Sequence, residues 1–325
     1  MRSKILLIIS AISALIFSPK ANFAQAPSLG TCSNFALFTA GGAFSNVGAA
    51  TIVTGDVGTH VGAFTAFPPG TLVGTIHWLD PASTQAATDV ATAYSDLDTP
   101  VGSPISVILN GQVLTPGIYF TGSGAAASLN GEIILNGQND PNSIFIIRID
   151  GALTTSTFSS VTLINKASLC NVYWQINGQF QLGVNSVFRG TILVNGAIIL
   201  LEGSSLLGRG LSIAGAIELH DNKVNFMPIA AGTITGTSSV CQGQSGVSYS
   251  VPAIDNATDY IWTLPIGATI TAGTNTNNIT VDFNAIATDG NITVDGTNSC
   301  GDGTVSADFA VTVNPLPIIS LIYHF

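Results

Sequence analysis

The feature that most constrains the fold of this 325-residue chain is a repeat of short apolar runs that end in glycine turns. Asn177-Gly178, Asn195-Gly196 and Ala214-Gly215 each follow a strand-like run, and their glycines are 18 and 19 residues apart. Alanine or glutamine, and then an apolar residue, comes after each of these glycines. A repeat of about twenty residues, made of strands and turns without a helix, is typical of one coil of a β-solenoid. The sequence therefore predicts stacked coils with flat outer faces.

The low charge content and the negative net charge argue against nucleic acid as a partner. Charged residues make up 8% of the chain, against roughly 25% in an ordinary globular domain. Because the net charge is −10 and only eight residues are Lys or Arg, nucleic acid is not expected as a partner. The 46% of hydrophobic residues excludes a disordered chain.

The N-terminus, residues 1–26, reads as a secretory signal peptide. Arg2 and Lys4 precede an apolar core from Ile5 to Phe17, and Ala24-Gln25-Ala26 fits the small-x-small cleavage rule. No later segment has the length of apolar sequence that a membrane-spanning helix needs. We expect a secreted or cell-surface protein with no membrane span in the mature chain.

Two domains are expected after the leader: a solenoid over residues 27–228 and a β-sandwich over 229–317, with a short tail at 318–325. No Lys or Arg follows Lys223, so the second domain is purely acidic. Alternating runs such as Val247–Val251 and Asn278–Phe283 favour an immunoglobulin-like sandwich, as does the order Cys241, Trp262, Cys300.

One helix is expected within the solenoid domain. Asp80-Pro81 supplies an N-cap and a proline at the first helical position. Apolar residues then recur at helical spacing to Leu97, and Thr99-Pro100 ends the pattern. We expect this helix to pack along one side of the solenoid.

The four cysteines are expected to form disulfides, as is usual in an exported protein. The simplest pairing is Cys32–Cys170 and Cys241–Cys300, although four cysteines allow three connectivities. No two of them have metal-ligand spacing, so zinc is not expected. Asp295 and the Gly301-Asp302-Gly303 turn could supply oxygen ligands for calcium, but their spacing matches no calcium loop, and a plain turn is expected there.

The chain lacks the motifs of hydrolases, phosphate-binding loops and metalloproteases, so we expect neither an enzyme nor a cofactor. Small polar residues instead gather between the strands. In stacked coils such clusters form a regular grid of hydroxyls and methyls, which orders water in an ice-like layer; the alternative is ordinary solvated turns. The candidate ice-binding residues are Ser45, Asn46, Thr154, Thr155, Ser156, Thr157, Gly183, Asn185, Ser204 and Ser205.

Several motifs, in the same order along residues 28–226, resemble the microbial ice-binding protein family. They include Thr54-Gly55-Asp56-Val57-Gly58, Phe67-Pro68-Pro69-Gly70-Thr71, Leu114-Thr115-Pro116-Gly117-Ile118-Tyr119 and Cys170-Asn171-Val172-Tyr173-Trp174-Gln175. The resemblance implies an irregular right-handed β-solenoid with an α-helix alongside, and one flat face that binds ice.

The second domain resembles a polycystic-kidney-disease-like module, through Tyr249-Ser250-Val251-Pro252, Tyr260-Ile261-Trp262 and Thr297-Asn298-Ser299-Cys300-Gly301. The first hypothesis is therefore an exported, monomeric ice-binding protein. The alternative is an adhesin or matrix protein that binds a glycan or a protein through both domains.

Overall fold

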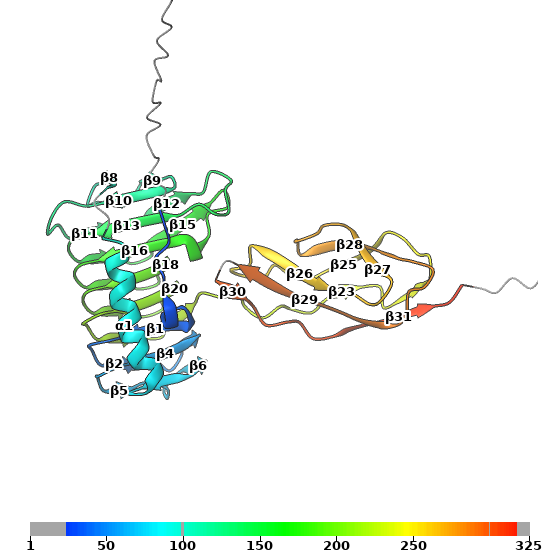
Figure 1. Ribbon diagram of the computed structural model, residues 1–325, viewed down its shortest axis with the longest axis horizontal. Helices are drawn as coiled ribbons and strands as arrows, with labels where there is room; N and C mark the ends of the chain where they lie inside the picture. Colours follow the sequence, from blue (N-terminus) through cyan, green and yellow to red (C-terminus); the bar gives the residue numbers. More distant parts are fainter. Residues whose placement is uncertain (1–23, 99–100, 299, 317–325) are drawn as a thin grey trace, which may run out of the picture.

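The computed structural model describes residues 24–98, 101–298 and 300–316 and divides them into two β-rich domains (Figure 1). The first is a solenoid of parallel strands with one helix alongside, and the second is a sandwich of largely antiparallel strands. The predicted fold class is therefore confirmed. Most of the predicted signal peptide and the predicted tail at 318–325 lie outside the described residues.

The solenoid has three faces. Face 1 is a separate seven-stranded parallel sheet, in the spatial order β11 (Ala127–Leu129), β14 (Leu153–Thr155), β17 (Phe180–Leu182), β19 (Ile198–Leu200), β21 (Ile217–Leu219), β2 (Phe44–Asn46) and β5 (Phe64–Thr65). Face 2 contains β9 (Val113–Leu114), β12 (Glu132–Asn136), β15 (Ser160–Ile164), the first halves of β18 (Val187–Val194) and β20 (Ser205–Ser212), β22 (Lys223–Asn225), β3 (Ile52–Thr54) and β6 (Thr71–Val73). Face 3 contains β8 (Ser103–Pro104), β10 (Gly117–Phe120), β13 (Phe145–Ile149), β16 (Val172–Ile176), the second halves of β18 and β20, β1 (Phe35–Thr39), β4 (Asp56–Thr59) and β7 (Ile76–Trp78).

Glycines let β18 and β20 bend from face 2 to face 3. Gly190 and Gly208 lie opposite each other in the two strands, with φ angles of 112° and 153°. A Cβ atom on Gly208 would lie 1.9 Å from the carbonyl oxygen of Gly190. Only glycine allows the backbones to approach this closely at the corner.

The order of the coils in space differs from their order in the chain. β1 lies between β20 and β4, β22 lies between β20 and β3, and β21 pairs with β2. The first two coils therefore stack under the last one, and we call this junction the seam. The helix then carries the chain along face 3 to the opposite end, from which the remaining coils return to the seam (Figure 1).

The helix α1 (Pro81–Asp96) begins where the sequence predicts. The carboxylate of Asp80 accepts from the backbone N–H of Ser83 at 2.7 Å, and the Ser83 hydroxyl accepts from the N–H of Asp80. This capping box satisfies two backbone donors that the first turn leaves free. Ala86, Val90 and Ala93 on the buried side of α1, with the C-cap residue Leu97, pack on face 3 against Phe38, Ile146, Tyr173, Leu193 and Leu211.

Buried hydroxyls hold the coils together at the corner between face 3 and face 1. The Thr39 hydroxyl donates to the carbonyl of Gly215 at 2.7 Å and accepts from the N–H of Gly42 at 3.0 Å. Thr59 and Ser212 make the equivalent pair of bonds to the glycine three residues later and to the neighbouring coil. Water does not reach the backbone groups inside a corner, so these hydroxyls supply the hydrogen-bond partners that the backbone N–H and C=O groups need.

Two short 3-10 helices join the strands of the solenoid, η1 (Gly30–Asn34) and η2 (Leu169–Asn171).

The second domain consists of two sheets that enclose a separate core around Tyr249, Val281, Phe283 and Val294. One sheet has the order β23 (Thr235–Gly236), β25 (Val247–Ser250), β28 (Asn278–Phe283), β27 (Ala268–Ala272). The other has the order β24 (Ser239–Cys241), β31 (Phe309–Asn314), β29 (Gly290–Asn298), β26 (Asp259–Thr263), with β30 (Gly301–Asp302) on β29.

The predicted disulfide pairing is wrong. The structure joins Cys170, on η2 of the solenoid, to Cys300, in the second domain, so the bond links the two domains. Cys32 is buried under α1, and its thiol donates to the carbonyl of Ala86 at 3.1 Å. Burial raises the pKa of this thiol to about 12, which keeps it protonated and unreactive. Cys241 is exposed and unpaired on β24.

Thiol labelling of the folded, non-reduced protein checks this pairing. We expect one modified residue, Cys241, with Cys32 reacting only after unfolding because its sulfur is buried. A non-reduced digest should contain the Cys170 and Cys300 peptides linked to each other. The Cys241→Ser variant is the control and should show no label while folded. A linked Cys241–Cys300 peptide would contradict the structure.

Candidate functional site

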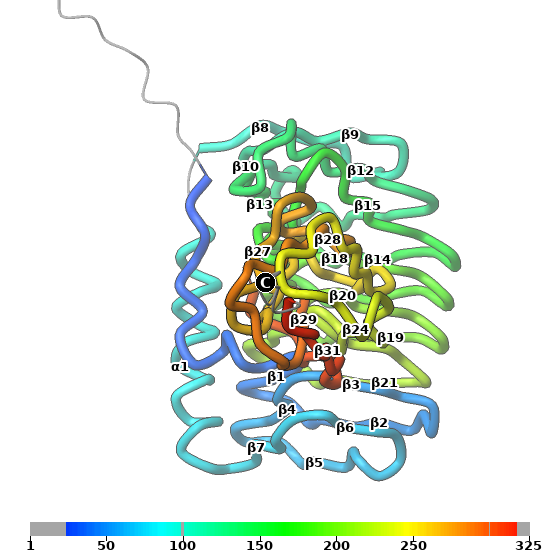
Figure 2. The backbone as a smooth tube through the Cα atoms, turned by 90° about the vertical axis from the view of Figure 1, so that its right-hand side faces the viewer, coloured from blue at the N-terminus to red at the C-terminus, as the bar shows by residue number. Residues whose placement is uncertain are grey.

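Face 1 is the face that no other part of the described chain covers. Face 3 carries α1, and the second domain leaves from the corner between faces 2 and 3. Figure 2 shows the second domain projecting toward the viewer, with α1 at one edge and β14, β19 and β21 of face 1 at the other. Face 2 is open in part, but its outward positions mix the charged Glu132 and Lys223 with the bulky Ile52 and Val73.

Two straight columns of side chains run along face 1. The first consists of the middle residues of the short strands, which pair in register from one coil to the next and are exposed or half-buried. In spatial order they are Ser128, Thr154, Gln181, Ile199, Glu218, Ser45 and Thr65. Neighbouring members are spaced by the distance between parallel strands, about 4.7–4.9 Å.

The second column precedes the first by two residues along each strand and consists almost wholly of alanine. Each member is adjacent to a paired, inward-facing residue, and none is buried. The members are Ala126, Ala152, Gln179, Ala197, Ala216, Ala43 and Ala63. The signal for this column is present in the sequence as the alanine or glutamine that follows each glycine turn, but sequence reasoning did not assign it to a surface.

Of the ten residues predicted as the site, two lie in the first column: Ser45 and Thr154. Three others point into the coil, and their exposed fractions are 3% for Asn46, 3% for Thr155 and 0% for Ser204. The Thr155 hydroxyl accepts from the N–H of Gly183 at 2.8 Å, and the Ser204 hydroxyl accepts from the amide of Asn222 at 3.0 Å. These side chains stabilise the corner between faces 1 and 2.

The remaining five predicted residues lie beside face 1 or off it. Ser156, Thr157 and Asn185 are exposed in the turns at the corner between faces 1 and 2. Gly183 is buried in the same turn, where a Cβ atom would lie 2.4 Å from the carbonyl oxygen of Ser156. Ser205 begins β20 on face 2, between Val187 and Lys223.

Comparison with known proteins identifies the class. The ice-binding-like family matches residues 38–225, which include every strand of face 1, and the chain belongs to this family. A PKD-like domain matches residues 227–311.

Individual relatives cover the same region. An ice-binding protein of Nostoc sp. (strain HG1) is 34% identical over 226 residues, which are 68% of this chain and 82% of the relative. An ice-binding protein of Flavobacterium frigoris (strain PS1) is 29% identical over 61% of this chain and 75% of its own length. The crystal structure of an ice-binding protein from an Antarctic biological consortium superimposes with a TM-score of 0.60 at 34% identity, covering 63% of this chain and 93% of that one.

Neighbouring threonines on β14 test which side chains face outward. We expect Thr155→Tyr to destabilise the protein by about 2–4 kcal/mol, because it inserts a ring into a packed corner and removes a hydrogen bond. We expect Thr154→Tyr to change the free energy of unfolding by less than about 0.5 kcal/mol, since its side chain points to solvent. Chemical denaturation measures both values. Equal effects would contradict the described register.

Proposed function

We propose that this chain is an exported ice-binding protein that adsorbs to ice through face 1. The observation that carries the proposal is the pair of uncovered, in-register columns on face 1, one almost wholly of alanine and the other with Ser and Thr at both ends. Membership of the ice-binding-like family, and the relatives named as ice-binding proteins, support ice as the partner.

The grid suits a solid surface of water. Alanine has no side-chain rotamer freedom to lose, and Ser and Thr have little, so their adsorption costs little conformational entropy. Parallel strands bonded on both sides hold the side chains at a fixed spacing. Hydroxyls at that spacing bond to ordered water, while the methyls beside them allow close contact. The columns contain no aromatic ring, which favours ice over a glycan.

The first column has larger side chains at its centre. Gln181, Ile199 and Glu218 stand between the hydroxyl-bearing Ser128 and Thr154 at one end and Ser45 and Thr65 at the other. The carboxylate of Glu218 is exposed, and ice contact would strip water from it without supplying a counter-ion. Glu218 therefore limits how closely the centre of face 1 approaches ice.

Export is supported by two observations. The link between Cys170 and Cys300 is of a kind that persists in oxidising compartments. Residues 1–26 have the sequence pattern of a secretory leader, with Arg2 and Lys4 before the apolar run from Ile5 to Phe17. In the described part of the chain, no helix combines the length and apolar character that crossing a membrane requires.

Tyrosine substitutions on face 1 test the proposed function. We expect Thr154→Tyr and Ala197→Tyr each to remove most of the thermal hysteresis and ice-recrystallisation inhibition, because a protruding ring separates the columns from ice. Thr71→Tyr, at an exposed position of face 2, is the matched control and should retain both activities. Full activity in both face 1 variants, with folding intact, would assign ice binding to another surface.

Removing the central carboxylate tests the role of Glu218. We expect Glu218→Thr to raise thermal hysteresis at equal molar concentration, because it replaces a hydrated charge with a hydroxyl and a methyl group. Glu132→Thr removes an exposed carboxylate from face 2 and should leave the activity unchanged. A loss of activity in Glu218→Thr would show that the carboxylate contributes to ice contact.

A further inference from the structure

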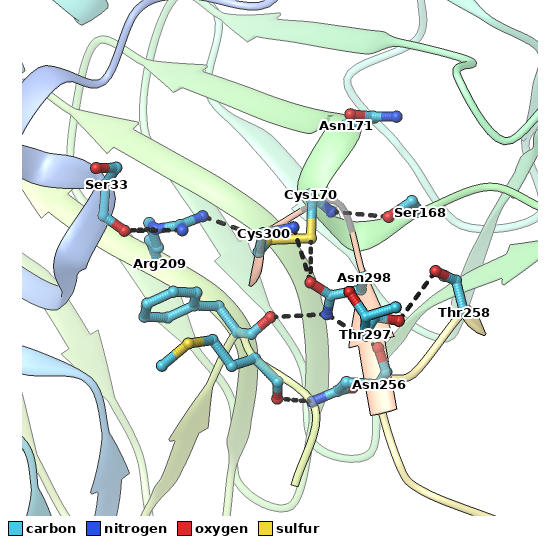
Figure 3. Close-up of a disulfide and its surroundings, with 12 residues drawn as sticks. Ser33, Ser168, Cys170, Asn171, Arg209, Asn256, Thr258, Thr297, Asn298 and Cys300 are labelled. Carbon is cyan, nitrogen blue, oxygen red and sulfur yellow. Dashed lines mark hydrogen bonds between the residues drawn. A yellow bond between two sulfur atoms is a disulfide. The ribbon is translucent and has the colours of Figure 1, made fainter. Parts of the chain in front are cut away.

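The two domains meet at a corner of the solenoid through a covalent bond as well as a linker. Cys170 is 6% exposed and belongs to the solenoid core, and Cys300 packs against that core from the second domain. The disulfide between them joins residues 130 apart in sequence. Together with the peptide chain after Phe226, it gives the second domain two attachments to the solenoid (Figure 3).

Hydrogen bonds fix the segment that leaves the solenoid. The amide nitrogen of Asn298, on β29, donates to the carbonyl of Phe226 at 3.2 Å and to that of Asn256 at 2.9 Å. Its amide oxygen accepts from the N–H of Cys300 at 2.7 Å, and the Asn256 side chain donates to the carbonyl of Met227 at 3.4 Å. Because Asn298 is 8% exposed, these bonds are shielded from competing water.

The linker also packs on the second domain. A Cβ atom on Gly296 would lie 3.2 Å from the Pro228 side chain, and one on Gly303 would lie 2.9 Å from the Pro228 carbonyl oxygen. The N–H of Ile229 donates to the carbonyl of Asp255 at 3.1 Å. The linker is therefore packed on the second domain along its course and belongs to the same rigid unit as that domain.

A buried arginine completes the joint from the solenoid side. Arg209, on β20, is 4% exposed; its guanidinium lies 3.8 Å from the centre of the Phe226 ring, and one nitrogen is 3.6 Å from the Cys300 sulfur. Two of its nitrogens donate to the carbonyl of Ser33 at 3.1 and 2.9 Å. Burial lowers the pKa of Arg209 to about 10, so it keeps its charge at neutral pH. It thus contacts both sides of the seam and the second domain.

We propose that this joint makes the second domain a rigid arm, locked by the Cys170–Cys300 disulfide and directed away from face 1. Modules joined by a small interface move relative to one another by default; the disulfide is what removes that freedom here. A dithiol reductant opens the lock by passing two electrons to the bond between the sulfurs. Each cysteine sulfur then takes up a proton, and the reductant leaves as a cyclic disulfide.

The direction of the arm means that the disulfide also keeps the second domain away from face 1, the surface proposed to contact ice. The arm leaves from the corner between faces 2 and 3, and in Figure 1 it extends to the right while β2, β5 and β11 of face 1 lie at the left. An arm fixed in this way cannot fold back over the two columns. It presents the second domain on the side of the molecule that points away from an adsorbed surface.

Measuring the rotational motion of the two domains tests whether the disulfide holds them rigidly, and this test does not depend on ice binding. The full chain is compared with the double variant Cys170→Ser/Cys300→Ser by backbone 15N relaxation and small-angle X-ray scattering. We expect one shared correlation time in the oxidised wild-type chain. We expect a shift to two correlation times, and a broader distribution of distances, in the double variant. Cys241→Ser is the control and should behave as the wild type.

Treatment of the folded wild type with dithiothreitol provides a second route, which serves if the double variant does not fold. Two correlation times in the oxidised wild type would overturn the rigid arm. One shared correlation time after reduction, with both thiols shown to be free, would overturn the disulfide as its lock. Ice-recrystallisation inhibition in the same samples should remain unchanged, so that failure of the lock and failure of ice binding are distinguishable.

Discussion

The architecture of the solenoid depends on close approach of backbones at its corners. Coils of about twenty residues stack only if the chain turns sharply, and each sharp turn buries N–H and C=O groups that water cannot reach. The protein meets this requirement with glycines such as Gly208, which remove a Cβ atom, and with buried hydroxyls such as Thr39 and Thr59. With the corners satisfied internally, the strands between them are free to present flat faces.

The same hydroxyls explain why the fold could be predicted from the sequence but the residues of the candidate site only in part. Glycine spacing predicted the solenoid, and the Asp80 cap predicted the helix, because both depend on local chemistry. The residues of the candidate site were harder to predict, because Thr and Ser occur in a solenoid both at buried corners and on exposed faces. A shift of one residue reverses the direction of a side chain, so the run at residues 154–157 holds Thr154, which points outward, beside Thr155, which points inward. Strands of three residues give too short a pattern to fix that register from sequence.

The disulfide could not be derived for a different reason. Pairing within each half of the chain rested on proximity in sequence, whereas Cys170 meets Cys300 only after both domains have folded and docked. Cys32, the predicted partner of Cys170, is instead covered by α1. Contacts between separately folded parts leave no periodic trace in a single sequence.

The seam affects how the solenoid, which forms a rod of stacked coils, assembles during folding. In a simple repeat array each unit contacts only its neighbours in sequence, so units can be added or removed at the ends. Here the hydroxyl of Thr39 bonds to Gly215, 176 residues later, in the interior of the rod, and both physical ends are built from internal segments of the chain. Formation of the seam must therefore await synthesis of nearly the whole solenoid, which makes folding a late, long-range event. Trimming coils from either side in sequence would open the rod at its centre and would not shorten it.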